Sequence, residues 1–165
     1  MAAEHYCRIF HELYGFETVA LRYFNVFGPR QDPSSPYSGV ISLFIKALHS
    51  GARPLILGDG QQTRDFTYVA NVVDGVLRAC TAPDAPGQAI NVATGGRVSL
   101  LELLSGLQKA MGTNLEPEFG LVRVGDVKDS QAAIEKAEKL LGYKTIVAFD
   151  EGLTRTVAWY RSVHA

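Results

Sequence analysis

Two arginines and one asparagine stand out among the residues of this 165-residue sequence whose side chains could bind a ligand. Arg64 and Arg123 each present a planar guanidinium, which can donate paired hydrogen bonds to a phosphate or a carboxylate. Asn25 ends a short apolar run, and α/β proteins bind ligands at the carboxyl ends of buried parallel strands. We therefore expect a site for a small anion, while an ion pair of Arg64 with Asp59 or Asp65 is the structural alternative.

Other residues with catalytic or metal-binding potential have less support. Cys7 and Cys80 lie far apart in helical patterns, which predicts small buried apolar side chains rather than a disulfide. Gly58-x-Gly60-x-x-Thr63 has half of a dinucleotide-binding turn, but a strand is expected next, where that turn requires a helix. No metal site is expected, because no two histidines have the spacing of metal ligands; they are His5, His11, His49 and His164.

Composition narrows the class of protein. The net charge is −1 and the pI about 6.4, which argues against a nucleic-acid binder because such proteins need a basic surplus to neutralise phosphates. No apolar run approaches the roughly 20 residues of a membrane span, and the first residues do not resemble a signal peptide. We expect a soluble cytoplasmic chain that binds neither nucleic acid nor membrane.

The elements that position these residues alternate between apolar strands and amphipathic helices, which predicts an α/β fold. The expected strands are 18–26, 54–57, 64–69 and 89–93. The expected helices are 2–14, 38–50, 71–81, 99–111, 130–141 and 151–162. The two apolar strands, 18–26 and 89–93, lack obvious partners, and a doubly wound sheet normally begins with a glycine-rich turn. That turn should precede the residues present here.

Two of the expected helices have a well-defined apolar face. In helix 2–14 this face comprises Ala3, Tyr6, Cys7, Phe10, Leu13 and Tyr14. In helix 71–81 the residues expected to be buried are Val72, Val73, Val76, Leu77 and Cys80. A capping box of Ser99 and Glu102 is expected to begin the helix that ends at Gly112.

Four motifs carry a resemblance to a known family. They are LRYFNVFGPRQ at 21–31, GDGQQTRDFTYV at 58–69, NVATGGRVSL at 91–100, and RVGDV at 123–127 followed by KA at 136–137 and LLGY at 140–143. Together they resemble the NAD-dependent epimerase/dehydratase family, the extended short-chain dehydrogenases/reductases, in family order. The run RQDP at 30–33 with Tyr37 favours the UDP-N-acetylglucosamine and UDP-glucose 4-epimerases, although dehydratases and UDP-glucuronate decarboxylases carry related runs.

The resemblance implies the C-terminal portion of a Rossmann-type fold. Residues 1–27 and about 71–100 would complete the parallel sheet, while about 28–70 and 112–165 would form the small substrate-binding part. The glycine-rich opening and the Tyr-x-x-x-Lys pair of the family are absent from these 165 residues. We expect a single truncated unit whose sequence begins just after the catalytic lysine.

The resemblance also assigns roles to particular residues. Arg64 and Arg123 would contact the diphosphate of a UDP-sugar, with Asp126 accepting from the ribose. For Arg123 and Asp126 the alternative is a solvated charge pair in a loop. Asn25 would contact the substrate as well.

Four apolar or aromatic residues complete the expected site. Val40 and Ile41 would line the uracil side, and Tyr23 and Phe24 would border the nicotinamide of NAD. For each of them a place in the core is the alternative, since such residues are mostly buried for packing alone.

The implied function is the substrate-binding part of a 4-epimerase, in which NAD oxidises and then reduces C4 of the sugar. Without the Tyr-x-x-x-Lys pair this chain is expected to be catalytically incompetent and a doubtful NAD binder. The alternatives are a non-catalytic UDP-sugar-binding remnant, a module that dimerises through helix 2–14, or, within the family, a dehydratase or decarboxylase.

Overall fold

The computed structural model describes residues 2–32 and 39–164. Each expected helix has a counterpart, although the helix expected over 130–141 begins only at Glu135. Ser38, which the sequence suggests as the cap of the helix expected over 38–50, lies outside the described residues. The helices are α1 (Ala2–Tyr14), α2 (Val40–His49), α3 (Val69–Ala79), α4 (Leu100–Met111), α5 (Glu135–Leu141) and α6 (Phe149–Val163). None of the described helices is both long and apolar enough to cross a bilayer.

The strands are short and pair in twos within the described residues. Three pairs are parallel: β1 (Ala20–Tyr23) with β6 (Ala89–Val92), β2 (Val26–Phe27) with β5 (Thr67–Tyr68), and β3 (Leu55–Leu57) with β8 (Glu118–Gly120). The fourth pair, β4 (Thr63–Arg64) with β7 (Val98–Ser99), is antiparallel. The chain is therefore an α/β protein with parallel strands and helices, as the alternating pattern predicts.

Two of the expected strands are interrupted. The run 18–26 divides into β1 and β2 because Asn25 adopts a left-handed conformation with a φ of 32°, so that the two pieces pair with different partners. The run 64–69 divides into β4 and β5. Strands β7 and β8, two and three residues long, were not expected, because such short runs show no recognisable alternation.

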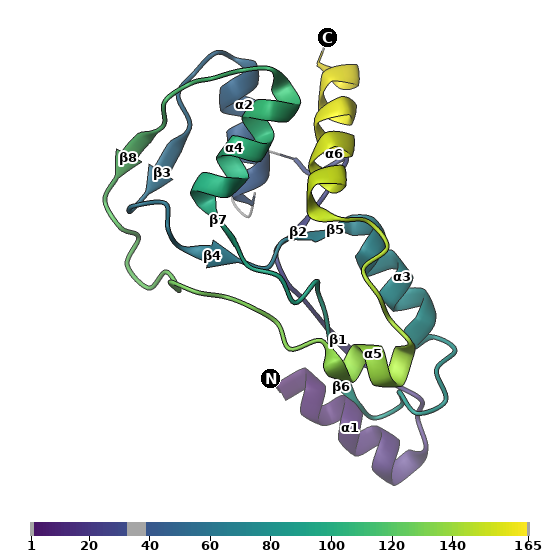
Figure 1. Cartoon of the computed structure of the whole chain (residues 1–165). Helices are drawn as coiled ribbons and strands as arrows, with labels where there is room; N and C mark the ends of the chain where they lie inside the picture. The colour runs from purple at the N-terminus through teal and green to yellow at the C-terminus, as the bar shows by residue number, and fades with distance from the viewer. Residues whose placement is uncertain (1, 33–38, 165) are drawn as a thin grey trace.

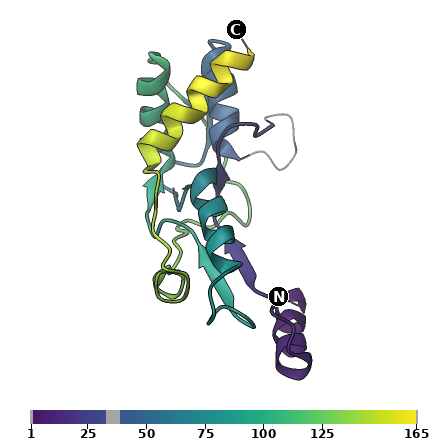
Figure 2. The same cartoon turned by 90° about the vertical axis from the view of Figure 1, so that its right-hand side faces the viewer.

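One end of the molecule, which we call the helical region, consists of α2, α4 and α6 (Figure 1). Figure 2 shows the same three helices gathered away from α1. Their inward side chains join those of β2, β3 and β5 in the larger core, whose most fully buried large members are Phe44, Ile41, Ile45, Ile56, Leu103, Leu107 and Leu153. The capping box of Ser99 and Glu102 begins α4, and Gly112 ends it with a φ of 65°, as predicted.

The other end, the sheet region, comprises β1, β6, α1, α3 and α5 (Figures 1 and 2). Its core is smaller: Ala85, Ile90, Val92, Ala137, Leu141 and Tyr143. Arg22 on β1 holds α1 through a two-pronged ion pair with Glu4, at 2.6 and 2.8 Å.

Two apolar faces of the sheet region are largely open: that of α3, which the sequence pattern predicts to be buried, and that of α1, which was expected to lack the sheet it should cover. No described residue of α1 is buried. On α3, Val72 is buried as predicted, but Val73 and Leu77 are 51% and 63% exposed and Cys80 is exposed as well. Cys7 is only partly buried, so neither cysteine is the core residue that its helical pattern predicts.

Candidate functional site

Arg64 lies on β4 with its guanidinium fixed in place. The side chain is only 15% exposed, and its Nη1 donates to the backbone oxygens of Thr63 at 2.7 Å and Lys128 at 3.3 Å. Its Nη2 forms an ion pair with the Asp126 carboxylate at 2.5 Å. The structure thus brings together two residues assigned to the site, while Asp59 and Asp65 are not the partners of Arg64.

Asp65, the next residue, points the opposite way and is fully buried. Its carboxylate accepts hydrogen bonds from the backbone N–H and hydroxyl of Thr94, at 3.0 and 2.6 Å, and from the N–H of Gly95 at 2.9 Å. The Ala132 N–H adds a longer bond of 3.3 Å. Asp65 therefore joins the end of β6 to the strand that carries Arg64, because successive side chains of an extended chain alternate in direction.

The segment that carries Asp126 is attached beside β4. The N–H of Thr63 donates to the Lys128 oxygen at 2.9 Å, and the Thr63 hydroxyl donates to Asp129 at 2.7 Å. Arg97 forms an ion pair with the same carboxylate at 2.6 Å. The Thr63 hydrogen bond, assisted by Arg97, lowers the pKa of Asp129 below its ordinary value, so this attachment is charged at neutral pH.

Arg123 precedes Asp126 in an exposed turn. Its backbone oxygen accepts from the Asp126 N–H at 3.1 Å, but its side chain forms no ion pair within the described part of the chain. Arg123 therefore lies three residues before Asp126 in the sequence, but no ion pair among the described residues fixes its guanidinium beside the Arg64–Asp126 pair.

A cavity of about 570 Å³ adjoins Asp126. Its lining combines apolar with polar side chains: Leu57, Gly58, Asp59, Gln62, Phe119, Val122, Asp126, Val127 and Lys128. Leu57 and Phe119 lie on the neighbouring strands β3 and β8. Neither was among the expected site residues. In sequence Leu55, Ile56 and Leu57 are all apolar, and only the structure shows that Ile56 is buried while the two leucines are exposed, so no sequence signal singles out Leu57.

A separate, much smaller cavity of about 50 Å³ is lined by three of the expected residues, Asn25, Val40 and Ile41. Ile41 is 2% exposed and belongs to the larger core. The Asn25 amide donates to the Asp65 backbone oxygen at 3.2 Å, which fixes the left-handed turn between β1 and β2. This space is too small for a pyrimidine ring.

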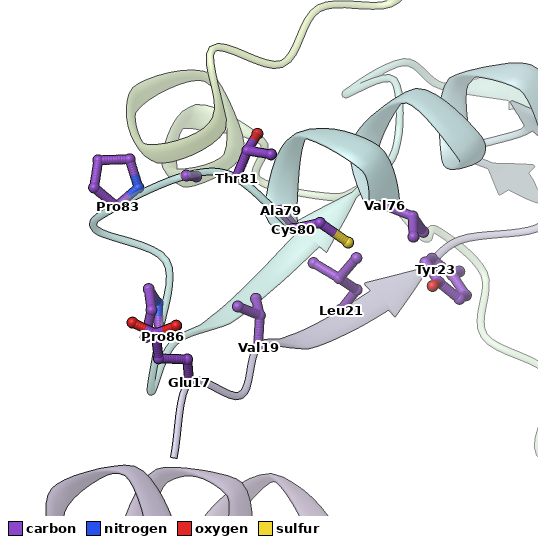
Figure 3. A pocket seen from close by; sticks show the side chains of 11 residues that line it. Glu17, Val19, Leu21, Tyr23, Val76, Ala79, Cys80, Thr81, Pro83 and Pro86 are labelled. Atoms are coloured by element: carbon purple, nitrogen blue, oxygen red, sulfur yellow. The ribbon is translucent and has the colours of Figure 1, made fainter. Parts of the chain in front are cut away.

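The residues expected beside a nicotinamide lie at the end of β1. Tyr23 is 51% exposed and lines a third cavity, of about 490 Å³, between β1 and α3, whereas Phe24 is partly buried (Figure 3). The turn at Gly58 and Gly60 continues into β4 and not into a helix, so it does not form the phosphate cradle that NAD requires. Among the described residues, no three His, Cys, Asp or Glu side chains lie close enough together to hold a metal ion.

The curated proteins that are similar to this chain include nucleotide-sugar enzymes. UDP-glucose 4-epimerase of Mycolicibacterium smegmatis is 38% identical over 98% of this chain and 51% of its own length. dTDP-D-glucose 4,6-dehydratase of Mus musculus is 35% identical over 97% of this chain and 45% of its own length. The chain therefore spans about half the length of the curated relatives it matches.

Solved structures agree with the sequence matches. UDP-glucose 4-epimerase of Thermotoga maritima, with UDP-glucose, superposes with a TM-score of 0.93 at 35% identity, covering 99% of this chain and 52% of that one. UDP-N-acetylglucosamine 4-epimerase of Methanobrevibacter ruminantium, with UDP-N-acetylmuramic acid, superposes with a TM-score of 0.93 at 38% identity. The match covers 98% of this chain and 52% of that one. UDP-glucuronic acid 4-epimerase of Bacillus cereus, with UDP-glucuronic acid and NAD, superposes with a TM-score of 0.87 at 32% identity. The match covers 98% of this chain and 51% of that one.

A family model matches more than half of the sequence. It is the model of the NAD dependent epimerase/dehydratase family, and it covers residues 1–93, which include β1, Arg64 and β6. By this match and by its likeness to UDP-glucose and UDP-N-acetylglucosamine 4-epimerases, the chain belongs to the NAD-dependent epimerase/dehydratase family.

Proposed function

We propose that this chain is the substrate-binding part of a nucleotide-sugar 4-epimerase and holds a UDP-sugar of the UDP-GlcNAc or UDP-glucose type. The observation that carries the proposal is the Arg64 guanidinium, which two backbone oxygens hold in an ion pair with Asp126, a residue that lines the cavity next to Leu57 and Phe119. A fixed guanidinium loses little side-chain freedom on binding a diphosphate, which favours tight and oriented binding.

In this proposal the diphosphate takes the place of Asp126 at Nη2 of Arg64, and Arg123 closes over it from the exposed turn. Asp126 then accepts hydrogen bonds from the ribose hydroxyls. The cavity between Leu57 and Phe119 receives the base, because it is lined by apolar side chains and lies next to Asp126. Asn25 would contact the substrate. Val40 and Ile41 were expected on the uracil side, but the cavity that they line with Asn25 is too small for a pyrimidine ring, so this proposal assigns the base to the larger cavity instead.

The proposed division of the chain follows from the same assignment. Residues 1–27 and about 71–100 complete a Rossmann-type sheet, and about 28–70 and 112–165 form the substrate-binding part. Because the sequence contains no Tyr-x-x-x-Lys pair and the described residues provide no NAD cradle, we propose that these 165 residues alone bind a UDP-sugar without turning it over. Tyr23 and Phe24 would border a nicotinamide only in a complete enzyme.

A second candidate is a nucleotide-sugar dehydratase, which the match to the mouse dTDP-D-glucose 4,6-dehydratase supports. The two candidates share the diphosphate site and differ in the sugar chemistry. The base distinguishes them: an epimerase fragment should prefer UDP-GlcNAc to dTDP-glucose, and a dehydratase fragment the reverse.

The test is calorimetric titration of the chain with UDP-GlcNAc, followed by NAD. We expect UDP-GlcNAc to bind, NAD not to bind, and Arg64→Ala to weaken UDP-GlcNAc at least about 30-fold, because such a contact contributes about 2–5 kcal/mol. Arg155→Ala is the matched control, since Arg155 forms an exposed ion pair with Glu151 on α6. Equal affinities of the two variants, or no binding by the unmodified chain, would refute the proposal.

A further inference from the structure

Two histidines from distant parts of the sequence meet at one end of the helical region. His49 is the last residue of α2, and His164 directly follows the last residue of α6. Figures 1 and 2 show the C-terminal ends of these two helices on the same side of the molecule, away from α1. The centroids of the two imidazole rings are 6.2 Å apart. Spacing along the sequence could not reveal this pair, because its members belong to different helices.

The ring of His164 is held in place by Tyr160. The two rings stack with their centroids 4.0 Å apart and an angle of 10° between their planes, and Nδ1 of His164 lies 3.0 Å from the Tyr160 backbone oxygen. A carbonyl oxygen can only accept, so Nδ1 donates, and the neutral ring has its free lone pair on Nε2. Histidines that bind a metal commonly have this arrangement, in which the second ring nitrogen donates to a backbone carbonyl.

Tyr160 also positions the second ring. The His49 ring meets it edge-on, with the centroids 5.3 Å apart. Tyr160 is buried in the larger core and is therefore a rigid support for both imidazoles. Neither ring nitrogen of His49 has a hydrogen-bond partner among the described residues, and the side chain is exposed. Both of its nitrogens are thus accessible to a ligand.

The position of the two rings favours a cation. Both histidines lie at helix C-termini, where the aligned peptide dipoles place partial negative charge. Arg161 is directed away from the pair, because its Nη2 donates to the Met111 oxygen at 2.7 Å. Lys46, one turn before His49, opposes a cation, but it is exposed and water screens its charge. Imidazole nitrogens suit zinc, whereas Mg²⁺ prefers oxygen ligands.

A zinc ion between the rings requires only a small movement. Zn–N bonds of about 2 Å place the centroids of two imidazoles on one tetrahedral ion about 5 Å apart, so the rings must approach by about 1 Å. The exposed side chain of His49 can rotate by this amount while His164 stays stacked. Among the described residues no third His, Cys, Asp or Glu joins the pair, so water would complete the coordination.

We propose that His49 and His164 form a two-histidine zinc site that links the C-terminal ends of α2 and α6. His164 coordinates the ion through Nε2, His49 coordinates it through one of its ring nitrogens, and water fills the remaining positions. The ligands must be unprotonated, so protons compete with the metal. The site does not include Arg64, and the proposal is therefore independent of UDP-sugar binding.

The experiment titrates the untagged chain with Zn²⁺ by calorimetry at neutral pH and repeats the titration with Mg²⁺. We expect one zinc ion per chain and no binding of Mg²⁺. His49→Ala and His164→Ala should each weaken zinc at least about tenfold, because a single imidazole cannot chelate the ion. Saturating zinc should raise the melting temperature of the unmodified chain and of neither variant, since the ion binds the folded helices.

The matched control is His5→Ala, which removes an exposed histidine on α1 and should leave zinc affinity unchanged. His11→Ala tests a competing location, because His11 follows Cys7 by one helical turn on α1. Absence of zinc binding, or equal affinities of His164→Ala and His5→Ala, would overturn the proposal. Affinity lost in His11→Ala but retained in His49→Ala would place the ion on α1 and overturn it as well.

Discussion

The helical region and the sheet region are both built from amphipathic helices, yet only in the first do the helices bury their apolar faces against one another. In the helical region α4 buries Leu103 and Leu107 against α2 and α6. In the sheet region α3 has the same kind of apolar stripe, but Val73 and Leu77 face solvent. An apolar stripe therefore indicates that one face of a helix packs against something, but it does not indicate whether the packing partner belongs to the same chain.

The position of the buried polar residues reinforces the contrast. Asn71 on α3 is fully buried and forms hydrogen bonds through both ends of its amide: its nitrogen donates to the Val147 oxygen at 2.9 Å, and its oxygen accepts from the N–H groups of Ile146 and Val147. The side of α3 that meets the rest of this chain is thus specified by hydrogen bonds, while its other side is apolar and open.

The largest expected effect comes from truncating one leucine in each region. Leu107→Ala should lower the free energy of unfolding by about 3–4 kcal/mol, because Leu107 is fully buried and its removal leaves a cavity. Leu77→Ala should change it by no more than about 0.5 kcal/mol, since Leu77 is exposed. Urea unfolding of both variants measures the difference, and a loss above about 1 kcal/mol for Leu77→Ala would contradict the open stripe.

An intermediate effect is expected at Asp65, which connects the two regions. Asp65→Asn should cost about 2–3 kcal/mol, because an amide nitrogen would face N–H donors that now share a carboxylate. Thermal unfolding followed by circular dichroism provides the measurement. Asp59→Asn is the control, since Asp59 is exposed and accepts from the Gln61 N–H in a turn. Equal melting temperatures for the two variants would show that the regions are not joined through Asp65.

The smallest effect concerns Tyr143, in the core of the sheet region. Burial, together with the charge of Asp65, raises the pKa of Tyr143 to about 12 from an ordinary 10. An unfolded chain loses this proton near pH 10, whereas the folded chain keeps it to about 12. The contribution of Tyr143 to the free energy of unfolding is therefore fully present below pH 10. It is lost as the pH rises toward 12, by about 1.4 kcal/mol per unit of pH.

Tyr143→Phe should remove this alkaline loss. Its free energy of unfolding at pH 7 should stay unchanged or rise by about 1 kcal/mol, because the buried hydroxyl has no hydrogen-bond partner among the described residues. Urea unfolding at pH 8, 10 and 11 gives the slope for both proteins. Parallel slopes would mean that solvent reaches Tyr143 and that the sheet region is open to its core.

The helices were predictable from the sequence because each has a local signal, such as the Ser99 and Glu102 capping box or the terminal Gly112. The strands were harder to predict from the sequence. The break at Asn25 depends on hydrogen bonds with Asp65 and Thr67, some 40 residues away. Strand β8 is defined only by its pairing with β3. The expected burial was wrong for Val73, Leu77 and Cys80, because periodicity indicates which face of a helix is apolar and does not indicate what covers that face.

For the candidate site, residue types could be predicted but not their partners. Arg64 was expected to bind an anion, and the structure shows that the anion held by the free chain is its own Asp126, which is 62 residues away. One wall of the cavity beside this pair is formed by β8, a strand that the sequence does not reveal. The place of Phe119 in the cavity could therefore not be predicted. The roles of the eight expected site residues remain predictions.

Any anion that binds Arg64 must first replace the Asp126 carboxylate in its ion pair. A simple ion such as chloride would have to displace a tethered carboxylate and leave it without its partner, so it gains little. A ligand that brings a phosphate for the guanidinium and hydroxyl groups for the released carboxylate satisfies both at once. If Arg64 binds a diphosphate as proposed, this internal ion pair competes with the ligand and favours ligands that carry both groups at the right separation.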